Sequence, residues 1–244
     1  MQHDAAAVRA WIDQAPAVAV LTGAGVSAES GVPTFRDAQT GLWAQFRPEE
    51  LATEAAFRGD PERVWNWYAM RRALLARVAP NDGHRALAAF QQRHPGRLTL
   101  VTQNVDGLHE QAGSVGVLAL HGTLAADRWL DTPARCCEAT ATVSGSPPRC
   151  SGCGNLRRPA VVWFGEQLPA DTLAAAERAA RSCALMLVAG TSGAVFPAAG
   201  LADTARRAGA RVVVFNPQRT ELDGLAHALL RGSAARLLPL LFAG

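Results

Sequence analysis

The chain has 244 residues, a formal net charge of +3 and a hydrophobic content of 49%. This apolar share is enough for a substantial core, and a charged fraction of 18% argues against intrinsic disorder. The basic residues are spread along the chain without a run, which favours a soluble enzyme over a dedicated nucleic-acid-binding protein. We therefore expect no specific nucleic-acid partner. The oligomeric state stays unknown at this level.

No apolar stretch is long enough to span a bilayer, and the first residues lack the basic start and apolar run of a signal peptide. We expect a cytoplasmic protein with no membrane partner. Because thiols stay reduced in the cytosol, the five cysteines are interpreted as metal ligands or buried thiols before disulfides. Four of them lie between residues 136 and 153, and Cys183 stands alone in an apolar run.

Four apolar runs predict buried parallel strands, and segments with helical spacing lie between them. The runs are Val18–Leu21, Leu98–Thr102, Ala184–Val188 and Arg211–Phe215. The helical segments are Pro61–Val78, Gly83–Arg93, Leu168–Cys183 and Ala198–Ala208. This alternation predicts an α/β fold with a parallel sheet covered on both faces. Residues 124–159 lack this alternation of strands and helices and are rich in Cys, Pro, Gly and Ser, so we expect a small separate module there.

A glycine-rich turn follows the first predicted strand and precedes an expected helix. It reads Gly23-Ala24-Gly25-Val26-Ser27-Ala28. Two glycines let a backbone turn tightly and bring its N–H groups close to a diphosphate. The same pattern occurs in plain turns, so alone it supports dinucleotide binding and a structural turn about equally. The acidic residue of dehydrogenases, roughly 20 residues further on, is not evident in the polar, Pro-interrupted continuation Glu29–Asp37.

Polar turns end the other strands. Thr102-Gln103-Asn104-Val105-Asp106-Gly107-Leu108-His109 suits recognition of a carboxamide and a ribose, although Asp106 could equally be a helix cap. His121-Gly122 follows Val117–Leu120. A neutral imidazole can take a proton from a sugar hydroxyl, but a lone histidine is more often structural. Gly190-Thr191-Ser192 and Asn216-Pro217 end two more strands. We expect all these turns to face one crevice beyond the carboxyl ends of the strands.

Taken in this order, and followed by Val161-Val162-Trp163-Phe164-Gly165-Glu166, these motifs resemble those of the sirtuins, which are NAD-dependent protein-lysine deacylases. The resemblance runs from about Trp11 to Pro239. It implies a large Rossmann-like domain of about residues 1–35, 80–123 and 160–244. It also implies a smaller domain of about residues 36–79 and 124–159 that includes a zinc-type module. NAD and an acyl-lysine protein substrate would enter the cleft between the two from opposite sides.

The resemblance also assigns roles to the matching positions. His121 is the expected general base, and Asn104 is the second expected catalytic residue. The NAD site is expected to comprise Gly23, Ala24, Gly25, Ser27, Thr34, Phe35, Arg36, Trp43, Gln103, Asn104, Val105, Asp106, Gly190, Thr191, Ser192, Asn216, Pro217, Gln218 and Ala234. The substrate peptide is expected to add as a β-strand along Val162, Trp163, Phe164, Gly165 and Glu166.

The implied chemistry consumes NAD as a co-substrate, whereas a dehydrogenase recycles it. The acyl-lysine carbonyl oxygen attacks the anomeric carbon as nicotinamide leaves, which gives an alkylimidate. His121 then deprotonates a ribose hydroxyl, which attacks the imidate carbon, and hydrolysis releases lysine and O-acyl-ADP-ribose. The alternatives are mono-ADP-ribosyl transfer to protein, a noncatalytic NAD-binding protein and a hydride-transferring dehydrogenase.

Trp67-Tyr68-Ala69-Met70-Arg71 indicates which acyl group is removed. Tyr68 and Arg71 are three residues apart and would share one face of a helix. They resemble the Tyr-x-x-Arg pair of sirtuins that prefer acidic acyl groups. A guanidinium can bind a carboxylate bidentately while a phenol donates a further hydrogen bond. The alternative is a core aromatic beside a surface arginine, but we expect removal of succinyl, malonyl or glutaryl groups, with acetyl as an additional substrate.

The cysteines depart from the sirtuin pattern, in which a zinc module carries two Cys-x-x-Cys pairs. Cys150-Ser151-Gly152-Cys153 matches the second pair, whereas an adjacent Cys136-Cys137 replaces the first. Structural zinc needs four tetrahedral ligands, and neighbouring cysteines supply two of them awkwardly. The pattern therefore predicts either a structural Zn²⁺ site rebuilt around Cys136, Cys137, Cys150 and Cys153, or weak or lost metal binding.

Overall fold

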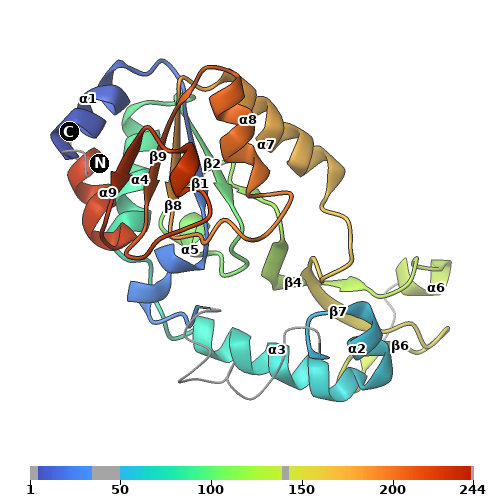
Figure 1. Ribbon diagram of the computed structural model, residues 1–244. Coiled ribbons are helices and arrows are strands. Elements are labelled where there is room, and N and C mark those ends of the chain that lie inside the picture. Colours follow the sequence, from blue (N-terminus) through green and yellow to red (C-terminus); the bar gives the residue numbers. More distant parts are fainter. Residues whose placement is uncertain (1–4, 35–49, 139–142, 243–244) are drawn as a thin grey trace.

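The computed structural model describes residues 5–34, 50–138 and 143–242 (Figure 1). A six-stranded sheet forms the larger part of the molecule, with the strand order β10-β9-β8-β1-β2-β3. The strands are β1 (Val18–Thr22), β2 (Leu98–Thr102), β3 (Leu118–Ala119), β8 (Leu185–Ala189), β9 (Arg211–Phe215) and β10 (Ala228–Leu230). All five pairings between neighbouring strands are parallel. The chain runs outward from β1 to β3 and then resumes at β8 on the other side of β1. A topological switch point therefore lies between β1 and β8, where ligands bind in open α/β sheets.

Helices cover both faces of this sheet, as the alternation of strands and helices predicted. On one face lie α1 (Ala5–Gln14), α4 (Asp82–Arg93) and α9 (Ala234–Phe242), and on the other lie α7 (Ala170–Ser182) and α8 (Gly200–Arg207) (Figure 1). Successive strand residues point to opposite faces. Accordingly, Val20 packs in the cluster under α4 and α9, and Leu21 packs in the cluster under α7 and α8.

The predicted α/β fold is confirmed. The predicted ranges of β2 and β9 match the structure, that of β1 is one residue short at its end, and that of β8 is shifted by one residue at both ends. The helix expected after the glycine-rich turn is wrong: two short 3₁₀ turns, η1 (Ala24–Val26) and η2 (Ala28–Ser30), stand there instead. Gly31, at φ +91°, ends the second turn in a left-handed conformation that an α-helix cannot continue through.

A second group of elements lies beside the carboxyl end of the sheet (Figure 1). It contains α2 (Glu54–Gly59), α3 (Pro61–Leu75), the short helix α6 (Arg135–Glu138), and the antiparallel pairs β4 (Gly122–Trp129) with β7 (Arg157–Val161) and β5 (Val143–Ser144) with β6 (Arg149–Cys150). The short helix α5 (Leu108–Gln111) belongs to the larger part, where it packs against α4. The start of α3 is encoded locally, because Asp60 accepts a hydrogen bond from the Arg63 N–H and Pro61 occupies the first turn.

This second group has its own apolar cluster, in which Phe57, Trp67, Tyr68 and Trp163 are buried. A separate cluster agrees with a smaller module beside the sheet, while the domain boundaries themselves stay a prediction. Within the described part of the chain, none of the helices combines the length and apolar character needed to cross a bilayer.

Candidate active site

The loops after β1 and β8 pack against each other backbone to backbone. The N–H of Gly25 donates to the carbonyl of Gly190 at 2.8 Å. A Cβ on Gly25 would lie 2.8 Å from the Cα of Gly190, and a Cβ on Gly190, at φ +60°, would lie 2.4 Å from the backbone nitrogen of Val26. Glycine is therefore required at both positions by loop packing alone. The close approach of a diphosphate that the sequence suggested stays a prediction.

Polar side chains after β2 hold the glycine-rich turn in place. The Asn104 amide donates to the Gly23 carbonyl at 3.1 Å and to the Ser27 hydroxyl at 3.2 Å. Ser27 in turn donates to Asp106 Oδ2 at 2.7 Å. The other oxygen of Asp106 accepts the N–H of Leu108 at the start of α5, at 2.9 Å. Asp106 thus caps a helix with one oxygen and organises the turn with the other, so the capping interpretation holds without excluding a role in binding.

A buried histidine that was not among the predicted site residues lies behind this network. His84 Nδ1 accepts the backbone N–H of Asn81 at 3.3 Å, so Nε2 carries the proton and faces the Ser27 hydroxyl at 3.4 Å. Burial lowers the pKa of His84 to about 4. The ring also packs against His109, at 4.8 Å between centroids. The Asn81-x-x-His84 spacing is that of a helix capping box, which the structure forms at α4, and this was the sequence signal for it.

His121 lies at the start of β4 with a defined tautomer. Its Nδ1 is 2.9 Å from the carbonyl oxygen of Gln103. Because a carbonyl only accepts, Nδ1 carries the proton and Nε2 keeps its lone pair in the neutral ring. Burial lowers the pKa of His121 from its ordinary value. The side chain is half-buried, so an uncharged base is present at neutral pH on a partly accessible ring.

The segment after β7 connects His121 to the expected substrate edge. The Val162 N–H donates to the His121 carbonyl at 2.8 Å, and the Phe164 N–H donates to the Ala52 carbonyl at 2.9 Å. Phe164 and Gly165 are exposed and Val162 is half-buried, whereas the Trp163 side chain is buried. The backbone of this segment is thus fixed on both sides and its outer residues reach solvent.

Tyr68 and Arg71 lie on one face of α3, as their spacing predicted. Tyr68 is buried, and its hydroxyl accepts a hydrogen bond from the Trp163 Nε1–H at 2.9 Å. The Arg71 guanidinium lies 4.8 Å from the Trp67 ring centroid and 5.6 Å from that of Tyr68. Desolvation lowers the pKa of Arg71 and raises that of Tyr68. A cation held in a poorly solvated aromatic setting interacts strongly with an incoming anion.

The remaining predicted residues are distributed around the same end of the sheet. Gln103 donates to the Thr191 hydroxyl at 3.0 Å, which joins the β2 and β8 loops. Asn216 is buried and donates to the Gln218 carbonyl at 3.0 Å, and Pro217 is exposed between them. The structure also describes Ala24, Thr34, Val105, Ser192 and Ala234, the last being the buried first residue of α9. Phe35, Arg36 and Trp43 lie outside the described residues.

The four clustered cysteines converge at the far end of the second group. The sulfurs of Cys136, Cys137, Cys150 and Cys153 all lie within 4.8 Å of one another, and none forms a disulfide. Tetrahedral zinc, with Zn–S bonds of about 2.3 Å, places its sulfurs about 3.8 Å apart. Hydrogen bonds from the backbone N–H groups of Cys153 and Gly152 lower the pKa of Cys150 to about 7, whereas the hydrogen bond with Cys153 raises the pKa of Cys136 and burial raises that of Cys137. The rebuilt four-cysteine set therefore fits a structural zinc, despite the adjacent pair.

The sequence of the chain also matches a known protein family. The model of the Sir2 family matches residues 23–197, which is more than half of the chain. The chain belongs to the Sir2 family. A "NAD-dependent protein deacylase" from Ralstonia nicotianae is 56% identical over 243 residues, which covers 98% of both chains. A protein of the same name from Aquifex aeolicus is 46% identical and covers 86% of this chain and 87% of that one.

Solved structures agree with this assignment of the Sir2-family chain. The crystal structure of a Sir2 homolog–NAD complex superposes with a TM-score of 0.87 at 42% identity, covering 99% of this chain and 93% of that one. A Sir2–p53 peptide–NAD+ complex superposes with a TM-score of 0.82 at 29% identity, covering 97% and 96%. The Rossmann-like fold expected from the resemblance is thus confirmed.

Proposed function

We propose that this Sir2-family chain is an NAD-dependent protein-lysine deacylase that removes succinyl, malonyl or glutaryl groups, with acetyl as an additional substrate. Its products would be free lysine, nicotinamide and O-acyl-ADP-ribose. The names of its relatives support the deacylase part. The observation that carries the acyl preference is the guanidinium of half-buried Arg71 over the ring of buried Tyr68 on α3.

His121 is proposed as the general base. Its Nδ1–H is committed to the Gln103 carbonyl, so Nε2 is the atom that accepts a proton from a ribose hydroxyl. The same hydrogen bond stabilises the charged ring after proton transfer, which offsets part of the desolvation cost. Asn104 is proposed to orient the reacting groups, since its side chain is already held between Gly23 and Ser27.

NAD is proposed to bind across the loops after β1, β2, β8 and β9, at the switch point of the sheet. The glycine-rich turn, Gln103–Asp106, Gly190–Ser192 and Asn216–Gln218 would line this site, with Ala234 near the adenine. The substrate peptide is proposed to pair with residues 162–166, whose outer side is exposed. The four cysteines would hold a structural zinc that cross-links α6 to the loop after β6 and takes no part in the reaction.

Arg71 and Tyr68 are proposed to bind the terminal carboxylate of an acidic acyl group. A planar guanidinium accommodates two carboxylate oxygens, and a phenol of raised pKa remains a neutral donor. An acetyl group lacks the anion and gains nothing from Arg71.

Arg71→Met tests this acyl preference. The variant keeps an apolar side chain of similar length but removes the charge, so kcat/KM on a succinyl-lysine peptide should fall by about 10- to 100-fold, the range for one charged hydrogen-bonded pair. The value for an acetyl-lysine peptide should change by less than about threefold. Mass spectrometry of both peptides with NAD gives the two values.

Arg63→Met is the matched control, because Arg63 lies in the first turn of the same helix, eight residues before Arg71, and its side chain is 49% exposed. It should leave both substrates unaffected. An equal loss on both peptides in Arg71→Met would contradict the carboxylate clamp. Transfer of label from NAD to protein, without O-acyl-ADP-ribose, would instead indicate mono-ADP-ribosyl transfer.

A further inference from the structure

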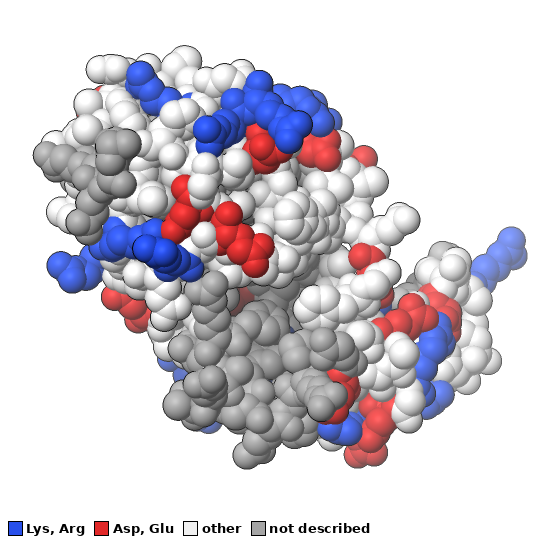
Figure 2. Space-filling model, in the orientation of Figure 1, with Lys and Arg blue, Asp and Glu red and all other residues white. Residues whose placement is uncertain are grey.

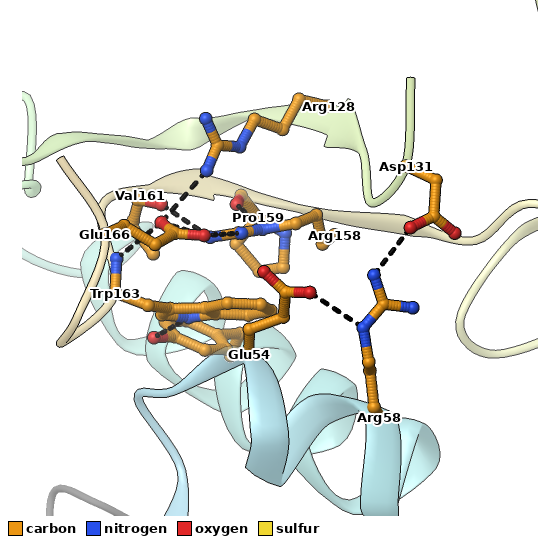
Figure 3. Close-up of polar contacts among 10 residues, drawn as sticks. Glu54, Arg58, Arg128, Asp131, Arg158, Pro159, Val161, Trp163 and Glu166 are labelled. Atoms are coloured by element: carbon orange, nitrogen blue, oxygen red, sulfur yellow. Dashed lines mark hydrogen bonds and ion pairs between the residues drawn. The ribbon is translucent and has the colours of Figure 1, made fainter. Parts of the chain in front are cut away.

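Arg158 is a buried charge that the proposed chemistry does not use. It lies in β7, its side chain is 1% exposed, and its guanidinium stacks over the Trp163 ring at 3.2 Å from the centroid (Figure 3). Nη2 donates to the Val161 carbonyl at 2.7 Å, and Nε donates to that of Pro159 at 3.3 Å. A buried guanidinium needs this many partners to offset its desolvation.

Glu166 neutralises the charge of Arg158 and binds the backbone of Trp163. Its carboxylate binds Arg158 through both terminal nitrogens of the guanidinium, binds Arg128 at 2.9 Å and accepts the backbone N–H of Trp163 at 2.8 Å (Figure 3). The Arg158 pairing lowers the pKa of Glu166 against the opposing effect of burial. Two contacts thus fix Trp163: its backbone N–H donates to Glu166, and the Arg158 guanidinium stacks on its ring.

The indole transmits this restraint to the acyl site. Trp163 Nε1–H donates to the Tyr68 hydroxyl at 2.9 Å, and the Phe57 ring packs against the indole with centroids 5.2 Å apart. A phenol oxygen that accepts one in-plane hydrogen bond directs its own O–H away from that donor. The position of the indole therefore determines where the Tyr68 proton points.

We infer that Arg158 is a positioning residue for acyl selectivity: stacked on Trp163 and paired with Glu166, it fixes the indole N–H that orients the Tyr68 hydroxyl toward an acyl carboxylate. This inference rests on the proposed removal of acidic acyl groups. Arg158 is proposed to touch no part of the substrate. Its pairing with Glu166 can influence the peptide along residues 162–166 whatever the acyl group, but its effect on acyl selectivity passes through Trp163 and Tyr68. Arg128 shares the same carboxylate but is not stacked on the indole, and its side chain is 49% exposed.

Arg158→Lys tests the inference because it keeps the charge for Glu166 but loses the planar stack. We expect the succinyl-to-acetyl ratio of kcat/KM to fall by about three- to tenfold, the range for one net hydrogen bond, through a raised KM for the succinyl peptide. Arg128→Lys should leave the ratio unchanged. In a Tyr68→Phe background, Arg158→Lys should no longer change the ratio, because the hydroxyl it orients is gone.

The inference is overturned if Arg158→Lys leaves the ratio unchanged, or lowers it equally with and without the Tyr68 hydroxyl. If circular dichroism shows that Arg158→Lys does not fold, the Trp163→Phe variant is used in its place. Trp163→Phe removes the indole N–H but keeps an aromatic ring. Trp163→Phe must then lower the ratio, and Tyr68→Phe must abolish that effect. If the wild type removes no acidic acyl group, or Arg71→Met leaves the ratio unchanged, the proposed function itself has failed.

Discussion

The proposed role of His121 as a base depends on a single hydrogen bond. The Gln103 carbonyl fixes the proton on Nδ1, and burial keeps the ring neutral. Since the pKa of His121 lies below its ordinary value of about 6.5, Nε2 is unprotonated through the neutral range and becomes protonated only in acid. The acid limb of kcat/KM should therefore have its midpoint below about pH 6.5.

A pH profile of deacylation measures this directly, with His121→Gln as the reference. Glutamine keeps a polar side chain but provides no base, so kcat should fall by about 100-fold or more at neutral pH. NAD binding, measured by calorimetry, should remain. An acid limb centred well above pH 6.5 would rule out the neutral, desolvated base.

Gly190 shows how a residue can be required by packing rather than by a ligand. Alanine there would combine a left-handed backbone with a Cβ 2.4 Å from the nitrogen of Val26. Strain of about 1–2 kcal/mol and overpacking of about 1–3 kcal/mol should together lower the free energy of unfolding by about 2–5 kcal/mol in Gly190→Ala. Urea titration measures the loss.

Gly116→Ala separates the two contributions. Gly116 has nearly the same φ, +61°, but a Cβ there would meet nothing within 4 Å. Only the backbone strain of about 1–2 kcal/mol should appear. Equal losses at the two glycines would mean that the contact between the β1 and β8 loops contributes nothing.

Among the elements, the four-cysteine module is the one whose stability we expect to depend on a bound metal. Two cysteines come from α6 and two from the turn that begins in β6, so the cluster joins two segments that lie apart in the sequence. The purified protein should contain about one zinc per chain. Cys150→Ser should lower both the zinc content and the Tm, because the metal contributes folding energy.

Cys183→Ala is the control for the cysteine prediction. Cys183 is also buried, but it packs in the core between the sheet and α7, away from the cluster. Its removal should leave the zinc content, measured by atomic emission, at the wild-type level. Substoichiometric zinc in a fully folded wild-type protein would contradict the four-thiolate site.

Elements with one strong local signal were predictable, and those set by their surroundings were not. Runs such as Leu98–Thr102 are apolar throughout because they are buried on both faces, and such runs stand out in sequence. By contrast, β10 has three residues and is defined by pairing with β9 alone. Two 3₁₀ turns stand after β1 in place of the expected helix, and Gly31 ends the second of them at a positive φ, which the spacing of apolar residues does not reveal.

The turns that line the candidate site were predictable from the sequence, but the hydrogen-bond network between them was not. Each turn at a strand end is visible as a cluster of small or polar residues, and a parallel sheet brings such turns together. Arg158 was not predicted because it binds backbone carbonyls, such as that of Val161, which leave no pattern in the sequence. His84 was not predicted as a site residue because its partner Ser27 is distant in the chain. Burial of a charged or titratable side chain is a property of the folded molecule, and one sequence does not display it.

At the scale of the whole molecule, the basic residues are of a single type. All 24 of them are arginine, so the chain contains no lysine. On the face in Figure 2, the arginines lie beside acidic side chains instead of forming one broad basic surface. Several of them pair along helices, as Arg207 does with Asp203 and Arg181 with Glu177. A guanidinium serves such pairs as well as an ammonium does and is not acylated under conditions that acylate lysine.

If the proposed lysine deacylation is correct, a chain without lysine cannot be its own substrate on a side chain. Incubation with a reactive acyl thioester such as succinyl-coenzyme A should therefore add no acyl group to any side-chain amine, and kcat/KM should stay within about twofold of its starting value. Intact-mass spectrometry and the peptide assay measure the two. Arg207→Lys, at a position whose side chain is 79% exposed, should gain one succinyl group, and NAD should restore the free lysine if one copy can act on another. Loss of activity in the acyl-treated wild type would show that a group other than lysine is modified, and would contradict the expected resistance.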